Sequence, residues 1–280
     1  MKSSSFKIAV VASGLAVALA IVAALAIKYG MSEAPVGTVL ITGSNRGIGL
    51  EFATQYAAKG WKVIATHRGD TVPESLKSLA DQYASVSVER MDVLRHEEID
   101  ALAAKLKDTP IDVLINNAGI MNTGDPASAQ TFGTLDYTLF DIYMHTNALG
   151  PLKVAESFLP HVAASNLKKI VNISSSSGKV SQPPHHSGNM WYRASKTALN
   201  GLMVTIVPTA RKVNVSVTMF EPGWTWTGQN EKNRLPGQLD AAQVGRHLDG
   251  LFVVGYVAVA VLPHGQHFQA LLLDLGFGFR

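Results

Sequence analysis

The 280-residue sequence contains no cysteine and few charged or aromatic residues, which make up 16% and 8% of the chain. Without cysteine the protein has no disulfide scaffold, thiolate metal site or thiol nucleophile, although this does not fix its compartment. The net charge is only +3 and no basic run occurs, so nucleic acid is not an expected partner. A hydrophobic content of 47% excludes a disordered chain and suffices for the core of one large domain.

One long apolar run lies at the N-terminus. No residue from Ile8 to Ile27 is charged, and lysines flank the run on both sides. As a helix it would span about 30 Å, the hydrocarbon thickness of a bilayer. We expect residues 1–34 to be an N-terminal hydrophobic helix that anchors the protein in a membrane through residues 8–27. Cleavage as a signal peptide and a soluble, cytoplasmic chain starting at Met31 remain the alternatives.

After this segment, strand-like and helical patterns alternate along the chain. Short apolar runs are separated by helix-length segments whose apolar residues are spaced three and four apart. This alternation predicts an α/β fold, a Rossmann-like doubly wound parallel sheet with helices on both faces. No repeat or linker marks a further boundary, so residues 35–280 are expected to form a single domain. The expected strands are Thr38–Thr42, Lys62–Thr66, Val86–Val88, Asp112–Asn116, Ile170–Ser174 and Val213–Phe220.

The first strand leads into the glycine-rich sequence TGSNRGIG, residues 42–49. A glycine turn between a strand and a helix exposes backbone N–H groups at the helix N-terminus, where a pyrophosphate binds. Gly43 would form the turn, Gly47 would permit close approach of the ligand, and Gly49 would let the helix pack on the strand. An ordinary βα turn can also use such glycines, but the position after the first strand favours nucleotide binding.

The end of the second strand bears on which nucleotide binds. NAD-binding proteins commonly place Asp or Glu here for the ribose hydroxyls, whereas this segment has no acid before Asp70. Arg68 and Arg46 instead offer two guanidinium groups for a 2′-phosphate, unless they are simply solvated surface residues. We therefore expect NADP(H) rather than NAD(H) as cofactor.

Three further motifs follow in order: NNAG at Asn116–Gly119, NISS at Asn172–Ser175 and YRASK at Tyr192–Lys196. With these motifs the chain from about Thr38 to Thr227 resembles the short-chain dehydrogenase/reductase superfamily, and within it the branch of C-factor-like and sniffer-like carbonyl reductases. The resemblance implies an NAD(P)-dependent oxidoreductase that transfers a hydride between nicotinamide and a small carbonyl or alcohol substrate.

Tyr192 and Lys196 are four residues apart, so on a helix their side chains project from one face. An ammonium near a phenol lowers the phenol pKa toward ambient pH and suits Tyr192 to general acid catalysis. The resemblance implies that Ser175 holds the substrate oxygen, with a shift of one residue left open within Ser174–Ser177. It also implies that Asn147 anchors a water that contacts Lys196.

Other cofactor contacts are expected from the loops that follow the strands. By resemblance, Asp92 meets the adenine, Asn117 lines the nucleotide cleft and Thr227 reaches the nicotinamide carboxamide or the phosphates. No metal site is expected, because the pair His185 and His186 has no third ligand. The expected cofactor-binding residues are Gly43, Asn45, Arg46, Gly47, Ile48, Gly49, Arg68, Asp92, Val93, Asn117, Ala118, Gly119, Tyr192, Lys196, Pro222, Gly223, Thr225 and Thr227.

Two segments depart from the family pattern. Pro208 falls within the helix that carries Lys196, so we expect this helix to end early. In many relatives the helix builds a dimer face, and the expected homo-oligomer is therefore in doubt. Residues 256–280 form an atypical tail, either a divergent strand at Tyr256–Leu262 or a membrane-facing or altered tail. Pro263 and two nearby histidines exclude a second membrane span.

These observations favour a membrane-anchored, NADPH-dependent carbonyl reductase or alcohol dehydrogenase that acts on a lipophilic substrate. The alternative is a non-catalytic nucleotide-binding sensor or signalling protein, because a fold does not fix a function. Such proteins usually lose the catalytic Tyr or Lys, and both are present here. A third interpretation, an isomerase or dehydratase, needs an added catalytic acid, for which Glu221 is the nearby candidate.

Overall fold

The computed structural model describes residues 36–124, 126–181, 187–223, 225, 239–241 and 243–244, and the backbone of two strands at 257–261 and 269–272. The chain divides after Val36 into two compact units, and every element below belongs to the second, Gly37–Arg280. The expected anchor lies outside the described residues. No helix within the described ranges is both long and apolar enough to cross a membrane.

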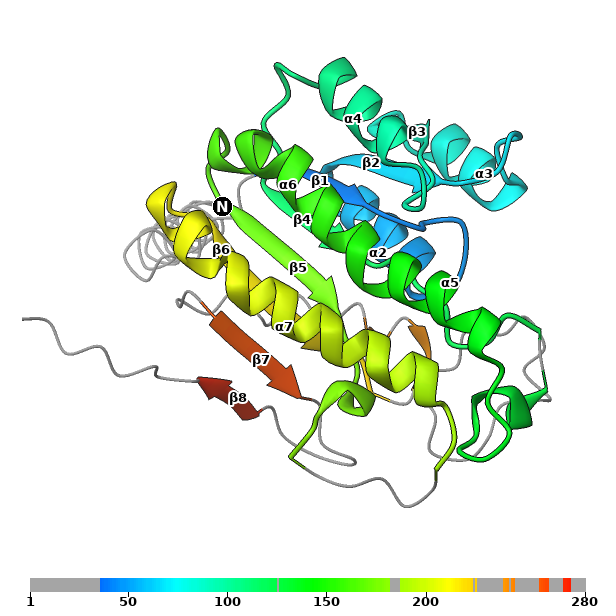
Figure 1. The fold of residues 1–280 in the computed structure, drawn as a ribbon. Coiled ribbons are helices and arrows are strands. Elements are labelled where there is room, and N and C mark those ends of the chain that lie inside the picture. The colour runs from blue at the N-terminus through cyan, green and yellow to red at the C-terminus, as the bar shows by residue number, and fades with distance from the viewer. Residues whose placement is uncertain are drawn as a thin grey trace, which may run out of the picture. The chain divides into compact units, whose positions relative to one another are not determined.

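One sheet of eight strands forms the centre of this unit, in the order β3-β2-β1-β4-β5-β6-β7-β8 (Figure 1). All pairs from β3 to β7 are parallel, and β8 is antiparallel to β7. The order of strands reverses between β1 and β4, where ligands of doubly wound folds bind. The sheet confirms the predicted Rossmann-like fold. The strands are β1 (Thr38–Ile41), β2 (Lys62–His67), β3 (Val86–Arg90), β4 (Val113–Asn116), β5 (Lys169–Ile173), β6 (Ser216–Glu221), β7 (Val257–Val261) and β8 (Gln269–Leu272).

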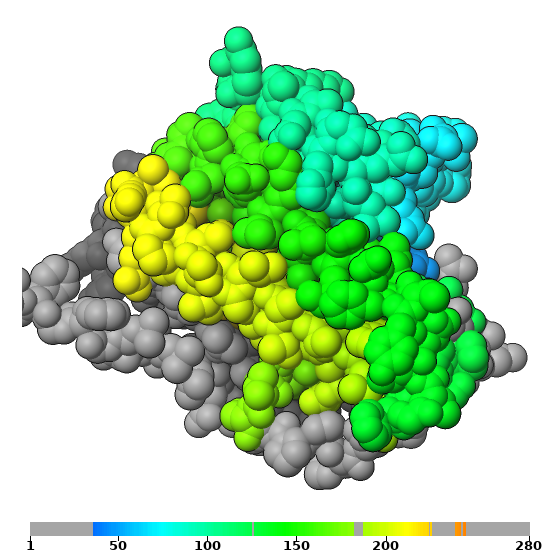
Figure 2. Space-filling model, in the orientation of Figure 1, coloured from blue at the N-terminus to red at the C-terminus, as the bar shows by residue number. Residues whose placement is uncertain are grey.

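Helices cover both faces of the sheet. Alternate side chains of a strand point to opposite faces, so each strand contributes to two cores. In β1, Val39 and Ile41 belong to the core under α2 and α3, whereas Leu40 belongs to the core under α4, α6 and α7. The latter helices lie in front of the sheet in Figure 1, and Figure 2 shows α7 exposed beside α6. The long helices are α2 (Gly47–Ala58), α3 (Glu74–Gln82), α4 (His96–Lys105), α6 (Gly150–Ala163) and α7 (Met190–Lys212). The short ones are η1 (Ala127–Gln130), η2 (Tyr137–Leu139), α5 (Phe140–Met144), the π-helical turn η3 (His145–Leu149) and η4 (Ser176–Gly178).

Helix α7 continues through Pro208 to Lys212, so the expectation that it ends early was wrong. Pro208 is exposed, and its ring and the missing N–H group lie on the solvent side of the helix. The buried residues Met203, Val207 and Ala210 keep the helix packed on the core on either side of the proline. Packing therefore outweighs the unfavourable helix propensity of proline. The expected dimer face is continuous, and a homo-oligomer stays an expectation.

The C-terminal half of the sheet corrects one expected strand and confirms another. β6 begins at Ser216 rather than Val213, because the chain first turns after α7. Asn214 makes this turn with a φ of 60°, in the left-handed region that Asn tolerates. The divergent strand expected at Tyr256–Leu262 is present as β7 and pairs with β6.

Candidate active site

The turn between β1 and α2 depends on glycine. Gly43 and Gly47 have φ values of 66° and 55°, which side chains other than glycine rarely adopt. A Cβ atom on Gly49 would collide with the carbonyl oxygen of Gly43, so α2 can approach the turn only without a side chain there. No side chain caps the N-terminus of α2. The backbone N–H groups of its first turn are left for a ligand, as a pyrophosphate site requires.

The loop after β4 secures the glycine turn from the other side. The Asn117 amide donates hydrogen bonds to the carbonyl oxygens of Thr42 and Gly43, at 2.9 and 3.0 Å. The Thr42 hydroxyl in turn accepts from the backbone N–H groups of Asn117 and Ala118. Asn117 thus holds the glycine turn in place, and its contact with a nucleotide stays a prediction.

Arg46, the N-cap residue of α2, and Arg68 follow the neighbouring strands β1 and β2 at the carboxyl ends of these strands. The N–H groups of Gly43 and Ser44 bond to Thr66, which joins the glycine turn to the end of β2. Both arginines are exposed, and neither forms an ion pair with another residue that the structure describes. Their guanidinium groups are therefore available to a phosphate at these strand ends.

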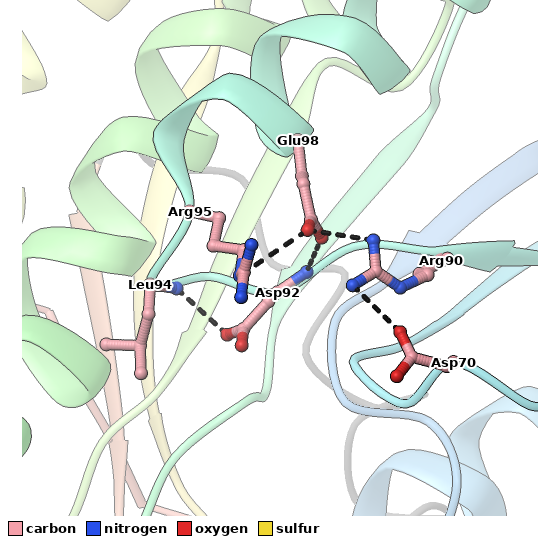
Figure 3. Close-up of polar contacts among 6 residues, drawn as sticks. All are labelled: Asp70, Arg90, Asp92, Leu94, Arg95 and Glu98. Carbon is pink, nitrogen blue, oxygen red and sulfur yellow. Dashed lines mark hydrogen bonds and ion pairs between the residues drawn. The ribbon is translucent and has the colours of Figure 1, made fainter.

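Asp92 lies in a charged network after β3 (Figure 3). The Glu98 carboxylate accepts from the Asp92 backbone N–H at 2.9 Å and from the Arg90 guanidinium at 2.8 Å. Arg90 also contacts Asp70, at 3.3 Å. The Asp92 carboxylate itself accepts from the Leu94 N–H at 3.0 Å. These contacts fix the turn that carries Asp92, whose contact with adenine stays a prediction.

Tyr192, Lys196 and Ser175 lie together, where α7 packs against the end of β5. The Lys196 ammonium donates to the Ile173 carbonyl oxygen at 2.7 Å and lies 5.9 Å from the centre of the Tyr192 ring. The Ser175 side chain lies close enough to the Tyr192 hydroxyl to lower the pKa of the tyrosine. The structure therefore brings together the three residues at the centre of the predicted catalytic set.

The geometry distinguishes Ser175 from its neighbours. The Ser174 hydroxyl points to the Asn200 side chain, to which it donates at 2.6 Å. The Ser175 hydroxyl contacts Tyr192 and also accepts from the Ser177 N–H at 3.1 Å, as the N-cap of η4. Of these serines, Ser175 is the one placed beside the tyrosine.

The pKa values of the pair differ from the expectation. Burial raises the pKa of Tyr192, the Ser175 hydrogen bond lowers it in part, and the nearby Glu221 carboxylate raises it further. Burial also lowers the pKa of Lys196 to about 8, because the ammonium is removed from water. The expected lowering of the Tyr192 pKa is therefore wrong. Desolvation is the largest of these causes, so the phenol retains its proton.

Glu221 is paired rather than placed as a free catalytic acid. Glu221 is the last residue of β6, and its side chain is 11% exposed. Its carboxylate lies 3.3 Å from the Lys179 ammonium. An isomerase or dehydratase would need this carboxyl group at the reacting atoms. The pairing with Lys179 therefore weighs against that interpretation.

Asn147 lies fully buried in the π-helical turn η3, a backbone form that is frequent at functional sites. Its side chain accepts from the Ile120 N–H at 2.8 Å and donates to the Ile120 carbonyl oxygen at 2.7 Å. It also donates to the Ser195 hydroxyl at 2.9 Å. Asn147 thus connects the loop after β4 with α7, and its role in holding a water stays a prediction.

Gly119 leaves space beside the lysine. A Cβ atom at this position would lie 3.1 Å from the Asn147 side-chain oxygen and 3.6 Å from the Lys196 nitrogen. The missing side chain and the uncapped helix at the glycine turn fit a dinucleotide, whose pyrophosphate would lie at α2 and whose nicotinamide half would lie near Lys196. The other expected residues of these loops are Asn45 and Ile48 in the glycine turn, Val93 after β3 and Ala118 after β4.

The loop after β6 is described only in part. Gly223 has a φ of 75° and, after Pro222, makes the expected bend. The Thr225 hydroxyl donates to the Pro222 carbonyl oxygen at 3.1 Å. Thr227 and the pair at 185–186 lie outside the described residues. Within the described ranges, no three metal-ligating side chains come together.

Three polar residues around Tyr192 were not expected from the sequence, namely Gln130, Tyr143 and Ser195. Ser195 carries a weak signal, because it lies inside YRASK and one helical turn after the tyrosine. Gln130 precedes Tyr192 by 62 positions and belongs to an irregular connection, where no periodic pattern could reveal it.

Comparison with known proteins assigns the family. The sequence model of the short chain dehydrogenase family matches residues 37–236 of this chain. The uncharacterized oxidoreductase YvrD of Bacillus subtilis is 30% identical over 191 residues, which cover 68% of each protein.

Two solved structures share this fold. A short-chain dehydrogenase/reductase from Burkholderia multivorans with bound NADP superposes with a TM-score of 0.68 and 29% identity, covering 78% of this chain and 91% of that one. The NADPH-bound carbonyl reductase from chicken fatty liver has a TM-score of 0.70 and 27% identity, covering 79% and 93%. The chain belongs to the short chain dehydrogenase family, and it is an oxidoreductase that transfers a hydride between a nicotinamide cofactor and a carbonyl or alcohol group.

Proposed function

We propose that the protein is an NADPH-dependent carbonyl reductase with Tyr192 as its proton donor. The observation that carries this proposal is the buried Lys196 ammonium, one helical turn from Tyr192 and 5.9 Å from the centre of its ring, with Ser175 beside the same tyrosine. Turnover of NADPH by the full chain in detergent, with para-nitrobenzaldehyde as the carbonyl, tests it. Tight NADPH binding without turnover of any aldehyde would instead support the sensor.

The two hydroxyls have different roles at the same carbonyl oxygen. Because they lie close together, both can bind this oxygen. A bound nicotinamide supplies the hydride. Tyr192 donates its proton to the oxygen as negative charge develops there, and Ser175 keeps the oxygen within reach. Lys196 stabilises the resulting phenolate by its charge and would also bind the ribose hydroxyls. Burial keeps the phenol protonated before the reaction, which favours reduction.

The proposal specifies NADP(H) over NAD(H), supported by Arg46 and Arg68 and by the absence of an acid at the end of β2. Replacing both arginines by alanine should raise the KM for NADPH roughly a hundredfold, since two charge-assisted hydrogen-bonded contacts are lost. The KM for NADH should stay nearly unchanged. Steady-state kinetics with both cofactors measures the ratio.

The matched control for this pair is Lys77→Ala, which removes an exposed cation of α3 outside the expected cofactor site. It should leave both KM values as they are. An unchanged preference in the double variant would contradict the assignment of the two arginines.

We further propose that residues 8–27 anchor the protein in a membrane and that its substrate is lipophilic. The uncharged run and its flanking lysines support the anchor. Replacing Leu15 and Leu19 by Arg in the full chain adds about 6 to 8 kcal/mol to the cost of insertion. The variant should therefore move from the carbonate-resistant membrane pellet to the supernatant, as detected by immunoblot. A wild-type chain already in the supernatant would favour a start at Met31.

A further inference from the structure

The first turn of α7, which carries Tyr192, has no local cap. Its N-cap residue, Asn189, is left-handed, with a φ of 58°, and its side chain makes no capping hydrogen bond. Backbone N–H groups in the first turn of a helix need acceptors from elsewhere. The acceptor for the Tyr192 N–H is the Gln130 side-chain oxygen, at 3.1 Å.

Gln130 belongs to η1, in the connection between β4 and α5, and is only 7% exposed. Its amide nitrogen donates to the Tyr143 hydroxyl at 2.8 Å and to the Met121 carbonyl oxygen at 3.2 Å. Tyr143, which is fully buried, donates to the same carbonyl at 3.0 Å. Both ends of the Gln130 amide are thus engaged, and they join α7 to residue 121.

A second series of hydrogen bonds reaches the other side of the Tyr192 residue. Its carbonyl oxygen accepts from the Ser195 hydroxyl at 2.8 Å, and that hydroxyl accepts from the Asn147 amide. Asn147 is bonded to both backbone groups of Ile120. The N–H and the carbonyl of Tyr192 are therefore tied to consecutive residues, Met121 and Ile120, directly after Gly119.

We infer that Gln130 is a positioning residue for Tyr192. It fixes the backbone of the tyrosine relative to the loop at 119–121, beside the space left for the nicotinamide half of the cofactor. This inference rests on the proposed function, because it requires Tyr192 to be the proton donor. A shift of about 1 Å in a catalytic group can cost roughly a hundredfold in rate, so a single buried tether of this kind has a measurable effect.

The test is Gln130→Met, which preserves the length of the side chain and removes its acceptor and donor. With para-nitrobenzaldehyde, kcat should fall roughly ten- to hundredfold. The Kd for NADPH should change less than about twofold, because the glycine turn and arginines are untouched. The kinetic isotope effect with deuterated NADPH should increase, since hydride transfer then limits the rate more than product release does.

Two further variants of the full chain sharpen the test. Gln130→Glu keeps an acceptor for the Tyr192 N–H but, as a carboxylate, cannot donate to the Met121 carbonyl oxygen, so kcat should recover only in part, to a value between those of the methionine variant and the wild type. Ser128→Ala changes an exposed residue of the same short helix and should have no effect.

The outcomes separate the inference from the proposed function. A wild-type protein that does not oxidise NADPH contradicts the proposed function itself. An active wild type with an equally active methionine variant overturns the positioning role. The positioning role is also overturned if the methionine variant shows an unchanged isotope effect and its kcat falls only in proportion to the fraction of protein that still binds NADPH. Fluorescence titration measures that fraction. If the methionine variant does not fold, Gln130→Asn takes its place, because its shorter amide cannot reach the Tyr192 N–H. This variant must then show both the loss of kcat and the increased isotope effect.

Discussion

Replacing Tyr192 by phenylalanine should lower kcat for carbonyl reduction roughly a thousandfold and raise the Kd for NADPH by about tenfold at most, the effect of one lost hydrogen bond. The change removes only the hydroxyl, and a positioned general acid contributes about 10²- to 10⁴-fold to a rate. Lys196 keeps its hydrogen bond to the Ile173 carbonyl, and the glycine turn is unaffected. Steady-state kinetics with para-nitrobenzaldehyde and a fluorescence titration with NADPH measure the two quantities.

Tyr83→Phe is the matched control for Tyr192→Phe. Tyr83 follows α3, and its hydroxyl accepts an exposed hydrogen bond from Gln82. Its loss should change neither kcat nor the Kd for NADPH. Full turnover by the Tyr192 variant would remove the proton-donor role on which both the mechanism and the inference about Gln130 depend.

Replacing Lys196 by methionine should affect activity and stability in opposite directions. kcat/KM should fall at least roughly a hundredfold, because the cation that stabilises the phenolate is lost. Lowering of the lysine pKa from 10.5 to about 8 corresponds to roughly 3 kcal/mol of desolvation in the folded protein. Methionine avoids this cost, and the lost hydrogen bond to Ile173 offsets about 1 kcal/mol. The free energy of unfolding at neutral pH should therefore rise by about 1 to 3 kcal/mol.

The stability difference between the Lys196 variant and the wild type should depend on pH. Between about pH 8 and 10.5 the lysine has lost its proton in the folded state but keeps it in the unfolded state. Unfolding then takes up a proton, so the stability of the wild type rises with pH toward that of the variant. Below about pH 8 the difference is constant and largest. Urea denaturation at a series of pH values measures it, and a difference that is flat across the window would contradict the assignment.

The sequence predicted those parts of the site that depend on short-range order. Strands alternate with helices, so the strands are parallel and their carboxyl ends lie on one side of the sheet. The glycine turn, NNAG and NISS each follow such an end and therefore had to converge. The spacing of Tyr192 and Lys196 placed both on one helical face. These features follow from periodicity and chain direction, which a sequence displays directly.

Other features depend on burial and on contacts between distant residues, which no local pattern contains. The pKa of Tyr192 was predicted in the wrong direction, because the distance to a lysine can be estimated from spacing but the loss of solvent cannot. Pro208 was expected to end α7, but buried residues before and after the proline keep the helix packed on the core. Gln130 reaches Tyr192 from an irregular connection whose path only the fold reveals.

The outer strands of the sheet bear on how the protein avoids aggregation. Unpaired N–H and carbonyl groups at a sheet edge can recruit a strand from another molecule. At one edge, β3 ends in Glu89 and Arg90, which pair with Lys105 and Glu98 at 2.7 and 2.8 Å. A second copy added there would have to accommodate these charges. At the other edge, β8 has four residues and offers few groups for pairing. The charged pairs at β3 thus disfavour the addition of a strand from another copy at that edge.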